Sequence, residues 1–166
     1  MLISFWRFCF NCLNSIPTSR GNGLKICLLR LGGTRVGNNV RVCSGVRVQG
    51  RGRLVLGSGV WISPDVIIRT SSEGSIEIGS YCDIGPSVEL ISGTHLVGNS
   101  DRRAGDDLGL SISIGNGTWL GARVIIIGGV SIGFGCVVGA GSVVTRDLIS
   151  NCLAAGVPAK VKKIYE

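Results

Sequence analysis

Residues 114–144 read IGNGTW-LGARVI-IIGGVS-IGFGCV-VGAGSV-V, a run of six-residue units that each begin with an aliphatic side chain. The second residue of most units is glycine, and the fifth is a second regular position with a small or aliphatic side chain. Helices repeat near 3.6 residues and alternating strands repeat every two, so neither produces this period. The period instead predicts a solenoid with short strands on its flat faces, in which each large aliphatic stacks on its counterpart in the next coil.

The same period extends upstream to Val36. The aliphatic position is filled there by Val36, Val42, Val48, Leu56, Ile62, Ile68, Ile78, Ile84 and Leu90. The second regular position is filled by Val40, Val46, Val60, Val66, Cys82, Val88 and Thr94. Glycine beside the aliphatic, as at Gly37, Gly85 and Gly133, lets the backbone turn at a corner without a Cβ clash. Each coil buries its apolar face only against its neighbours, so both ends of the solenoid need a cap.

The pattern divides the chain into three parts. These are an apolar, basic, helical segment at 1–33, the solenoid at 34–150 with a polar loop at 95–111, and a tail at 151–166 that covers the far end or packs along a side.

The N-terminal segment is apolar nearly all round up to Ile16, and Pro17 should break it before a second apolar stretch, Leu24–Leu31. The first run is too short to span a bilayer. It also lacks the features of a secretory signal. A helix here either packs on its own protein or lies in a membrane interface, and the sequence leaves both open.

Composition narrows the possible functions. With 45% hydrophobic and 16% charged residues, the composition disfavours disorder. The 27 glycines lack the three-residue spacing of collagen, which excludes that class. The seven cysteines are an odd number, and with no export signal they favour a reducing compartment, the cytoplasm. His95 is the one histidine, so a zinc site with three histidines from one chain is impossible, and we expect no metal.

Charge is concentrated at the start of the chain. Nine basic residues and no acidic residue precede Asp65, and because the whole chain carries +7, the remainder nets −2. A positive end favours anionic partners such as phospholipid headgroups or acidic sugars, although a solvated basic edge without a partner explains it as well. The basic residues are not interleaved with aromatics, so we expect no nucleic-acid binding.

Four stretches of this sequence resemble the hexapeptide-repeat acetyltransferases, in particular the maltose, galactoside, nodulation and polysaccharide O-acetyltransferases. They are Ile114–Ala122, Gly129–Gly133, Val138–Asp147 and Ala155–Lys160, and the resemblance covers about residues 34–164. It implies a left-handed parallel β-helix, homotrimers with active sites between adjacent subunits, and acetyl-CoA as the acetyl donor.

The polar segment 95–111 interrupts the repeat, and a long loop in a compact fold is more often functional than accidental. In the resembled family the histidine at the position of His95 is the general base. It takes the proton of an acceptor hydroxyl as the oxygen attacks the thioester of acetyl-CoA, without an acyl-enzyme. Histidine suits this role because it exchanges protons near neutral pH.

Other parts of the site are less defined by the sequence. Backbone N–H groups near 119–121 are expected to stabilise the tetrahedral intermediate. Trp119 either walls the site beside His95 or packs over the outside of a coil. Spacing does not single out the carboxylate that orients His95 among Asp83, Glu89, Asp106 and Asp107.

The resemblance also assigns the remaining binding residues. Acetyl-CoA contacts fall on Gly121, Ala122, Ala140, Thr145, Arg146 and Lys160. The small residues among them leave room for a pantetheine arm, serve a tight corner, or do both, while Arg146 and Lys160 suit the phosphates. Arg69 and Glu73 stand near the acceptor-binding positions of the small-sugar enzymes but differ from them. We therefore expect a glycan or lipid-linked sugar rather than free maltose or galactoside.

Together these features predict a cytoplasmic homotrimer, free or peripheral to the inner membrane face, that acetylates a sugar hydroxyl in surface polysaccharide synthesis. Acetylation of an amino sugar or of an antibiotic are alternatives within the enzyme class. A non-catalytic β-helix scaffold is the alternative outside it, and it would treat His95 as incidental.

Overall fold

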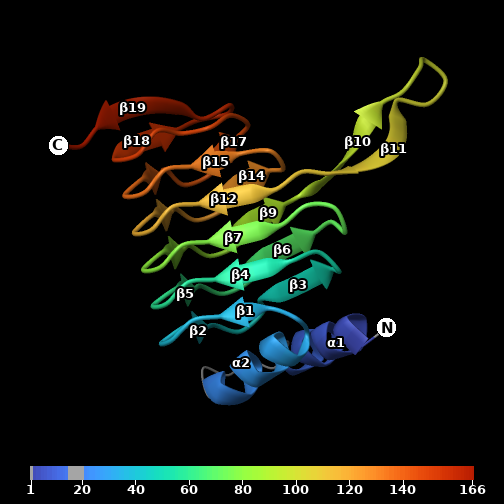
Figure 1. Ribbon diagram of the computed structural model, residues 1–166. Coiled ribbons are helices and arrows are strands. Elements are labelled where there is room, and N and C mark those ends of the chain that lie inside the picture. The colour runs from blue at the N-terminus through green and yellow to red at the C-terminus, as the bar shows by residue number, and fades with distance from the viewer. Residues whose placement is uncertain (1, 15–20) are drawn as a thin grey trace.

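The computed structural model describes residues 2–14 and 21–166. From Arg35 onward the chain winds into a parallel β-helix with three sheets, one along each face (Figure 1). The first sheet contains β1 (Arg35–Val36), β4 (Leu54–Leu56), β7 (Ile76–Ile78), β12 (Ile112–Ile114) and β15 (Ser131–Ile132). The second contains β2 (Arg41–Val42), β5 (Trp61–Ile62), β8 (Asp83–Ile84), β13 (Trp119–Leu120), β16 (Val137–Val138), β18 (Cys152–Ala155) and β19 (Lys160–Ile164). The third contains β3 (Arg47–Gly50), β6 (Ile67–Thr70), β9 (Glu89–Ile91), β14 (Ile125–Ile127) and β17 (Val143–Val144).

Parallel pairing stacks equivalent hexad positions, as the sequence predicts. Ile78 pairs with Leu56 below it and Ile114 above it, and all three side chains are buried. The fifth hexad position is buried as well, including Cys82, Thr118 and Ser142, but Thr94 is not. Thr94 is exposed because the chain leaves the solenoid after Ile91, so the prediction that it belongs to the repeat is wrong.

The corner glycines are required by the coil that lies on them. A Cβ at Gly85 would come within 2.6 Å of the Leu120 carbonyl oxygen, and one at Gly133 within 2.4 Å of the Ser150 amide nitrogen. Left-handed backbone occurs at other turn positions, such as Asn39 with φ 56° and Gly117 with φ 66°. A Cβ at these corner glycines would therefore clash with the backbone of the next coil, and not with the backbone of its own turn.

Two helices, α1 (Leu2–Asn14) and α2 (Asn22–Leu31), close the N-terminal end, and we call this pair the cap (Figure 1). Side-chain amides of the cap pair with the open edge of the first coil. The Asn11 amide donates to the Val48 carbonyl at 3.0 Å and accepts from the Val48 N–H at 2.9 Å. Asn22 makes the same kind of contact with Val40 and Val42. The expected break at Pro17 lies outside the described residues.

Two basic residues of the cap are buried and satisfy carbonyl groups. Arg7 donates to the carbonyl oxygens of Gly50 at 2.6 Å and Gly52 at 2.8 Å, and to the Thr70 hydroxyl at 2.9 Å. Lys25 Nζ donates to the Val42 carbonyl at 3.2 Å, and burial lowers the pKa of this amine. Arg7 and Lys25, two of the nine basic residues before Asp65, are therefore buried against the first coils and do not contribute to a basic surface.

The segment expected as a loop at 95–111 forms a β-hairpin of β10 (Gly93–Val97) and β11 (Ala104–Gly109), which projects from the stack of coils in Figure 1. The segment from residue 151 adds one more strand to the solenoid, β18, and then turns back as β19 in antiparallel pairing. The parallel pairing of the second sheet therefore continues into the segment predicted as the tail.

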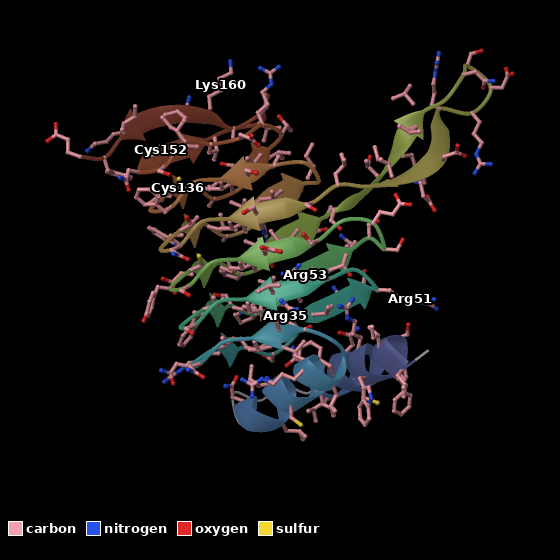
Figure 2. The ribbon with its side chains drawn as sticks, viewed as in Figure 1. Arg35, Arg51, Arg53, Cys136, Cys152 and Lys160 are labelled. Atoms are coloured by element: carbon pink, nitrogen blue, oxygen red, sulfur yellow. The ribbon has the colours of Figure 1, made fainter. Side chains whose placement is uncertain are left out.

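All seven cysteines are free thiols. Cys136 and Cys152, labelled in Figure 2, are buried with their sulfur atoms 3.7 Å apart. Burial, and then the neighbouring Cys136 thiol, raise the pKa of Cys152 to about 11. Cys152 therefore fills a core position as a protonated thiol, with the buried Cys136 packed against it.

Candidate active site

His95 lies on β10 directly opposite Asp107 of β11, so the hairpin pairing brings their side chains together. His95 Nδ1 is 3.2 Å from Asp107 Oδ1 and 3.2 Å from the Gly105 carbonyl oxygen. Both neighbours accept hydrogen bonds, so in the neutral ring Nδ1 carries the hydrogen. Nε2 is then left with a free lone pair, as a general base requires.

A surface pocket surrounds His95 where the hairpin joins the solenoid. Its lining comes from the hairpin and from the turn after β6, and consists of Ser71, Ser72, Gly93, Thr94, His95, Asp107 and Leu108. Nothing in the sequence singled out the two serines, because small polar residues are common in turns. Asp107 was one of four carboxylates that spacing could not separate.

Arg69 and Glu73, the expected acceptor residues, flank these serines but differ in their contacts. Arg69 forms an ion pair with Glu89 and donates to the Gln49 side chain at 3.2 Å, so its guanidinium is held along the third sheet. Glu73 is exposed at the foot of the hairpin, where a Cβ on Gly109 would come within 2.8 Å of its Cβ.

Trp119 does not share the His95 pocket within one chain. It lies on the second sheet in a separate hollow, with Trp61 and Asp83 in register on neighbouring coils. The N–H groups of Trp119 and Gly121 donate to the carbonyls of Cys136 and Val138, both at 2.8 Å. These two groups belong to the ladder between coils and are not free to serve as the expected donors to a tetrahedral intermediate.

The residues expected to bind acetyl-CoA lie along the C-terminal coils. Thr145, Arg146 and Lys160 line one pocket together with Pro158 and Ala159. Ala122 is linked to the same region because its carbonyl accepts from the Gly141 N–H at 2.8 Å. Figure 2 shows Lys160 at the opposite end of the solenoid from Arg35, Arg51 and Arg53.

Among the residues expected to bind acetyl-CoA, Gly121 is glycine because the next coil packs tightly against it. A Cβ on Gly121 would come within 2.6 Å of the Ala140 nitrogen in the next coil, which requires glycine at this corner. Ala140 is itself exposed and leaves little side chain over that edge. The arrangement can accept an extended, partly anionic ligand whose phosphates meet Arg146 and Lys160.

The repeat, the hairpin histidine and the basic C-terminal pocket define a protein of the hexapeptide-repeat class, and comparison with known proteins identifies the family. A model described as the hexapeptide repeat of succinyl-transferase matches residues 111–146. WcaF of Escherichia coli strain K12, which its name assigns to colanic acid biosynthesis as an acetyltransferase, is 35% identical over 137 residues, 81% of this chain and 71% of its own. The chain belongs to the hexapeptide-repeat acetyltransferases.

Two further proteins are similar to the chain. Galactoside O-acetyltransferase of E. coli K12 is 42% identical over 87 residues, covering 52% of this chain and 43% of its own. A solved galactoside acetyltransferase in complex with coenzyme A superimposes with a TM-score of 0.68 at 26% identity, over 99% of this chain and 82% of that one. The fold is thus the left-handed parallel β-helix that the resemblance implies. The chain spans about half the length, or less, of the first curated relatives it matches.

Proposed function

We propose that this protein is an acetyl-CoA-dependent O-acetyltransferase that acts on a sugar hydroxyl in the assembly of a surface polysaccharide. The observation that carries the proposal is the geometry at His95, whose Nδ1 has two acceptors at 3.2 Å and whose Nε2 is left to accept a proton. The polysaccharide role is supported by the similarity to WcaF, which extends over most of both chains.

In the proposed reaction His95 Nε2 takes the proton of the acceptor hydroxyl while that oxygen attacks the carbonyl carbon of the acetyl thioester. A carbon–oxygen bond forms, the carbon–sulfur bond then breaks, and the proton returns from the imidazolium to the departing thiolate. Arg146 and Lys160 hold the phosphates of acetyl-CoA, with the pantetheine arm along Ala122 and Ala140.

The proposed active unit is a homotrimer in which the site is completed between subunits. His95 sits on a hairpin that projects from its own solenoid, while Trp119 and Trp61 flank a hollow on another face. A hairpin that reaches a neighbouring copy would bring the two together, as the resembled family implies. We place the enzyme in the cytoplasm, at the inner membrane face, where lipid-linked glycan intermediates would be its acceptors.

The test combines acetyl-CoA binding with turnover. In His95→Ala we expect thiol release from acetyl-CoA in the presence of acceptor to fall by about 100- to 10,000-fold. Because only the base is removed, the rise in melting temperature caused by CoA should be unchanged. Asn38→Ala, at an exposed position on the first coil away from the hairpin, is the control and should retain full activity. Near-normal turnover of His95→Ala would overturn the assignment of the base.

Acceptors should be screened in the same thiol-release assay with sugar nucleotides, polysaccharide fragments and amino sugars. Product analysis then separates O-acetylation from N-acetylation, since only the ester is labile to mild base. If CoA produces no rise in melting temperature, the scaffold alternative replaces the enzyme.

A further inference from the structure

The two helices of the cap turn polar side chains toward the solenoid, where a capping helix would normally turn apolar ones. In α1 the side chains turned toward the solenoid include Arg7, Asn11 and Asn14, and each bonds to a backbone carbonyl of the first coil or the segment just after it. In α2 Asn22 and Lys25 do the same. Helices that cover a protein core normally turn their apolar side inward and their polar side to water.

Phe10 and Leu29 are buried in the core, but several other apolar side chains of the cap face outward. Leu2, Phe5, Phe8, Leu24 and Leu31 are all exposed, and with the exposed Cys12 and Cys27 they make up what we call the outer cap face. Phe8 alone is 65% exposed. Figure 1 shows the two helices as the last layer of the molecule at this end, with no other described element beyond them. An exposed apolar surface of this kind marks an interaction site.

The surroundings of this face are basic. Arg30, Arg35, Arg41, Arg47 and Arg51 are all exposed on the cap or the first coil. Arg51 reaches α1 directly, because its Nε donates to the Ser4 hydroxyl at 3.1 Å. Phe8 and Arg51 line one shallow hollow between α1 and β3, so apolar and basic groups meet there. Figure 2 shows Arg51 beside this end of the molecule.

We propose that the outer cap face docks on a bilayer surface that carries anionic lipid headgroups. The exposed aromatic and aliphatic side chains enter the interface between headgroups and acyl chains, and the arginines around them bind lipid phosphates. Neither described helix is long and apolar enough to cross a membrane, and docking of this kind needs no spanning segment. The proposal supplies the surface for the membrane-face location in the proposed function, but its test does not depend on acetyl transfer.

A second copy of the chain is the competing occupant, and charge disfavours it. Two caps meeting about a two-fold axis would place the same surface on both sides of the contact. The first 64 residues contain no acidic side chain, so arginines would face arginines without a compensating charge. An anionic bilayer matches both the apolar centre and the basic surroundings.

Vesicle sedimentation of the full chain tests the proposal. We expect the protein to pellet with vesicles of phosphatidylcholine containing about 30% phosphatidylglycerol, and at least about tenfold less with phosphatidylcholine alone, and high salt should weaken the pelleting. Phe5→Ser with Phe8→Ser should lower the affinity about tenfold or more by removing apolar burial. Phe134→Ser is the matched control, because Phe134 is 56% exposed on the solenoid and should not contribute.

The native cysteines of the outer cap face can show whether this face contacts the bilayer. A charged, water-soluble maleimide should modify Cys12 and Cys27 more slowly when vesicles are present, while labelling of the partly exposed Cys43 on the solenoid stays unchanged. Site-resolved mass spectrometry reads each rate. Arg51→Gln should weaken binding at low salt, and Arg102→Gln in the hairpin should not.

Three outcomes would overturn the docking proposal: no pelleting with the anionic vesicles, equal loss in Phe134→Ser, or a smaller oligomer in Phe5→Ser with Phe8→Ser, which would assign the face to a second copy. The rise in melting temperature with CoA, measured on the same variants, keeps the two proposals apart. If CoA fails to bind but vesicles do, only the proposed catalytic function falls.

Discussion

His95 and Asp107 owe their contact to the pairing of β10 with β11, since the solenoid contributes neither residue. Opposite positions on an antiparallel pair place side chains on the same face, within reach of each other. Asp107 is 96% exposed on its side chain, so water screens its charge, and the Gly105 carbonyl shares the task of holding the ring. Asp107 is therefore a positioning residue with a modest effect.

At this scale we predict that Asp107→Ala lowers kcat by about tenfold, far less than the loss of a buried triad carboxylate, and leaves KM for acetyl-CoA unchanged. The reason is that Gly105 still accepts from Nδ1 while the orientation of the ring loosens. Steady-state kinetics measures kcat and KM, and nitrogen NMR of the His95 imidazole reports the change in hydrogen bonding at Nδ1. Asp106→Ala is the control, and an equal loss there would remove the special role of Asp107.

The position of His95 could be predicted because the hexads stop just before it, but its partner could not. Asp107 depends on the register of a hairpin whose pairing shifts between His95 and Val97, and no turn motif in the polar segment fixes that register. The ion pair of Arg69 with Glu89 was likewise invisible in the sequence, since it joins residues on successive coils.

At the scale of elements, the cap has a mostly apolar sequence, yet it contacts the first coil through polar side chains. The spacing of Arg7, Asn11 and Asn14 is helical, so the polar stripe could have been found, but apolar residues outnumber it and suggest an inward apolar face. The open edge of the first coil decides the orientation. Its unpaired carbonyls and N–H groups need partners more than the apolar side chains need burial.

We predict that Arg7→Met opens this end of the molecule. Loss of the guanidinium leaves the carbonyls of Gly50 and Gly52 without their donor, which should cost about 3 kcal/mol, or roughly a hundredfold in local hydrogen exchange. Exchange of the β1–β3 amides, followed by mass spectrometry, measures the effect. Arg47→Met, at an exposed position, should change little. Equal protection in both variants would contradict the capping role.

At the scale of the whole molecule, we propose that the site is shared by two chains, since His95 and Trp119 lie in separate pockets of one chain. The hexads predicted the solenoid well, since an aliphatic side chain at every sixth position marks the side of each coil that is buried. Assembly was accessible only through the family resemblance, because contacts between subunits leave no period in the sequence.

Subunit mixing tests this arrangement. His95→Ala and Trp119→Ala should each be inactive alone, but trimers reassembled from an equal mixture should regain roughly a quarter of the sites, because one interface in each mixed trimer joins two intact halves. Thiol release before and after reassembly measures the gain. No recovery, with mixed trimers verified by mass spectrometry, would mean that each chain holds a complete site.

The amide pairing of Asn11 and Asn22 has one more consequence. A stack of identical coils is a one-dimensional lattice, and nothing in its repeat limits its length, because every bare end is a template for the next layer. The two asparagines imitate peptide groups and so complete the lattice without offering a new surface for growth. By terminating the lattice with side chains, the protein keeps an architecture prone to filament growth as a discrete particle.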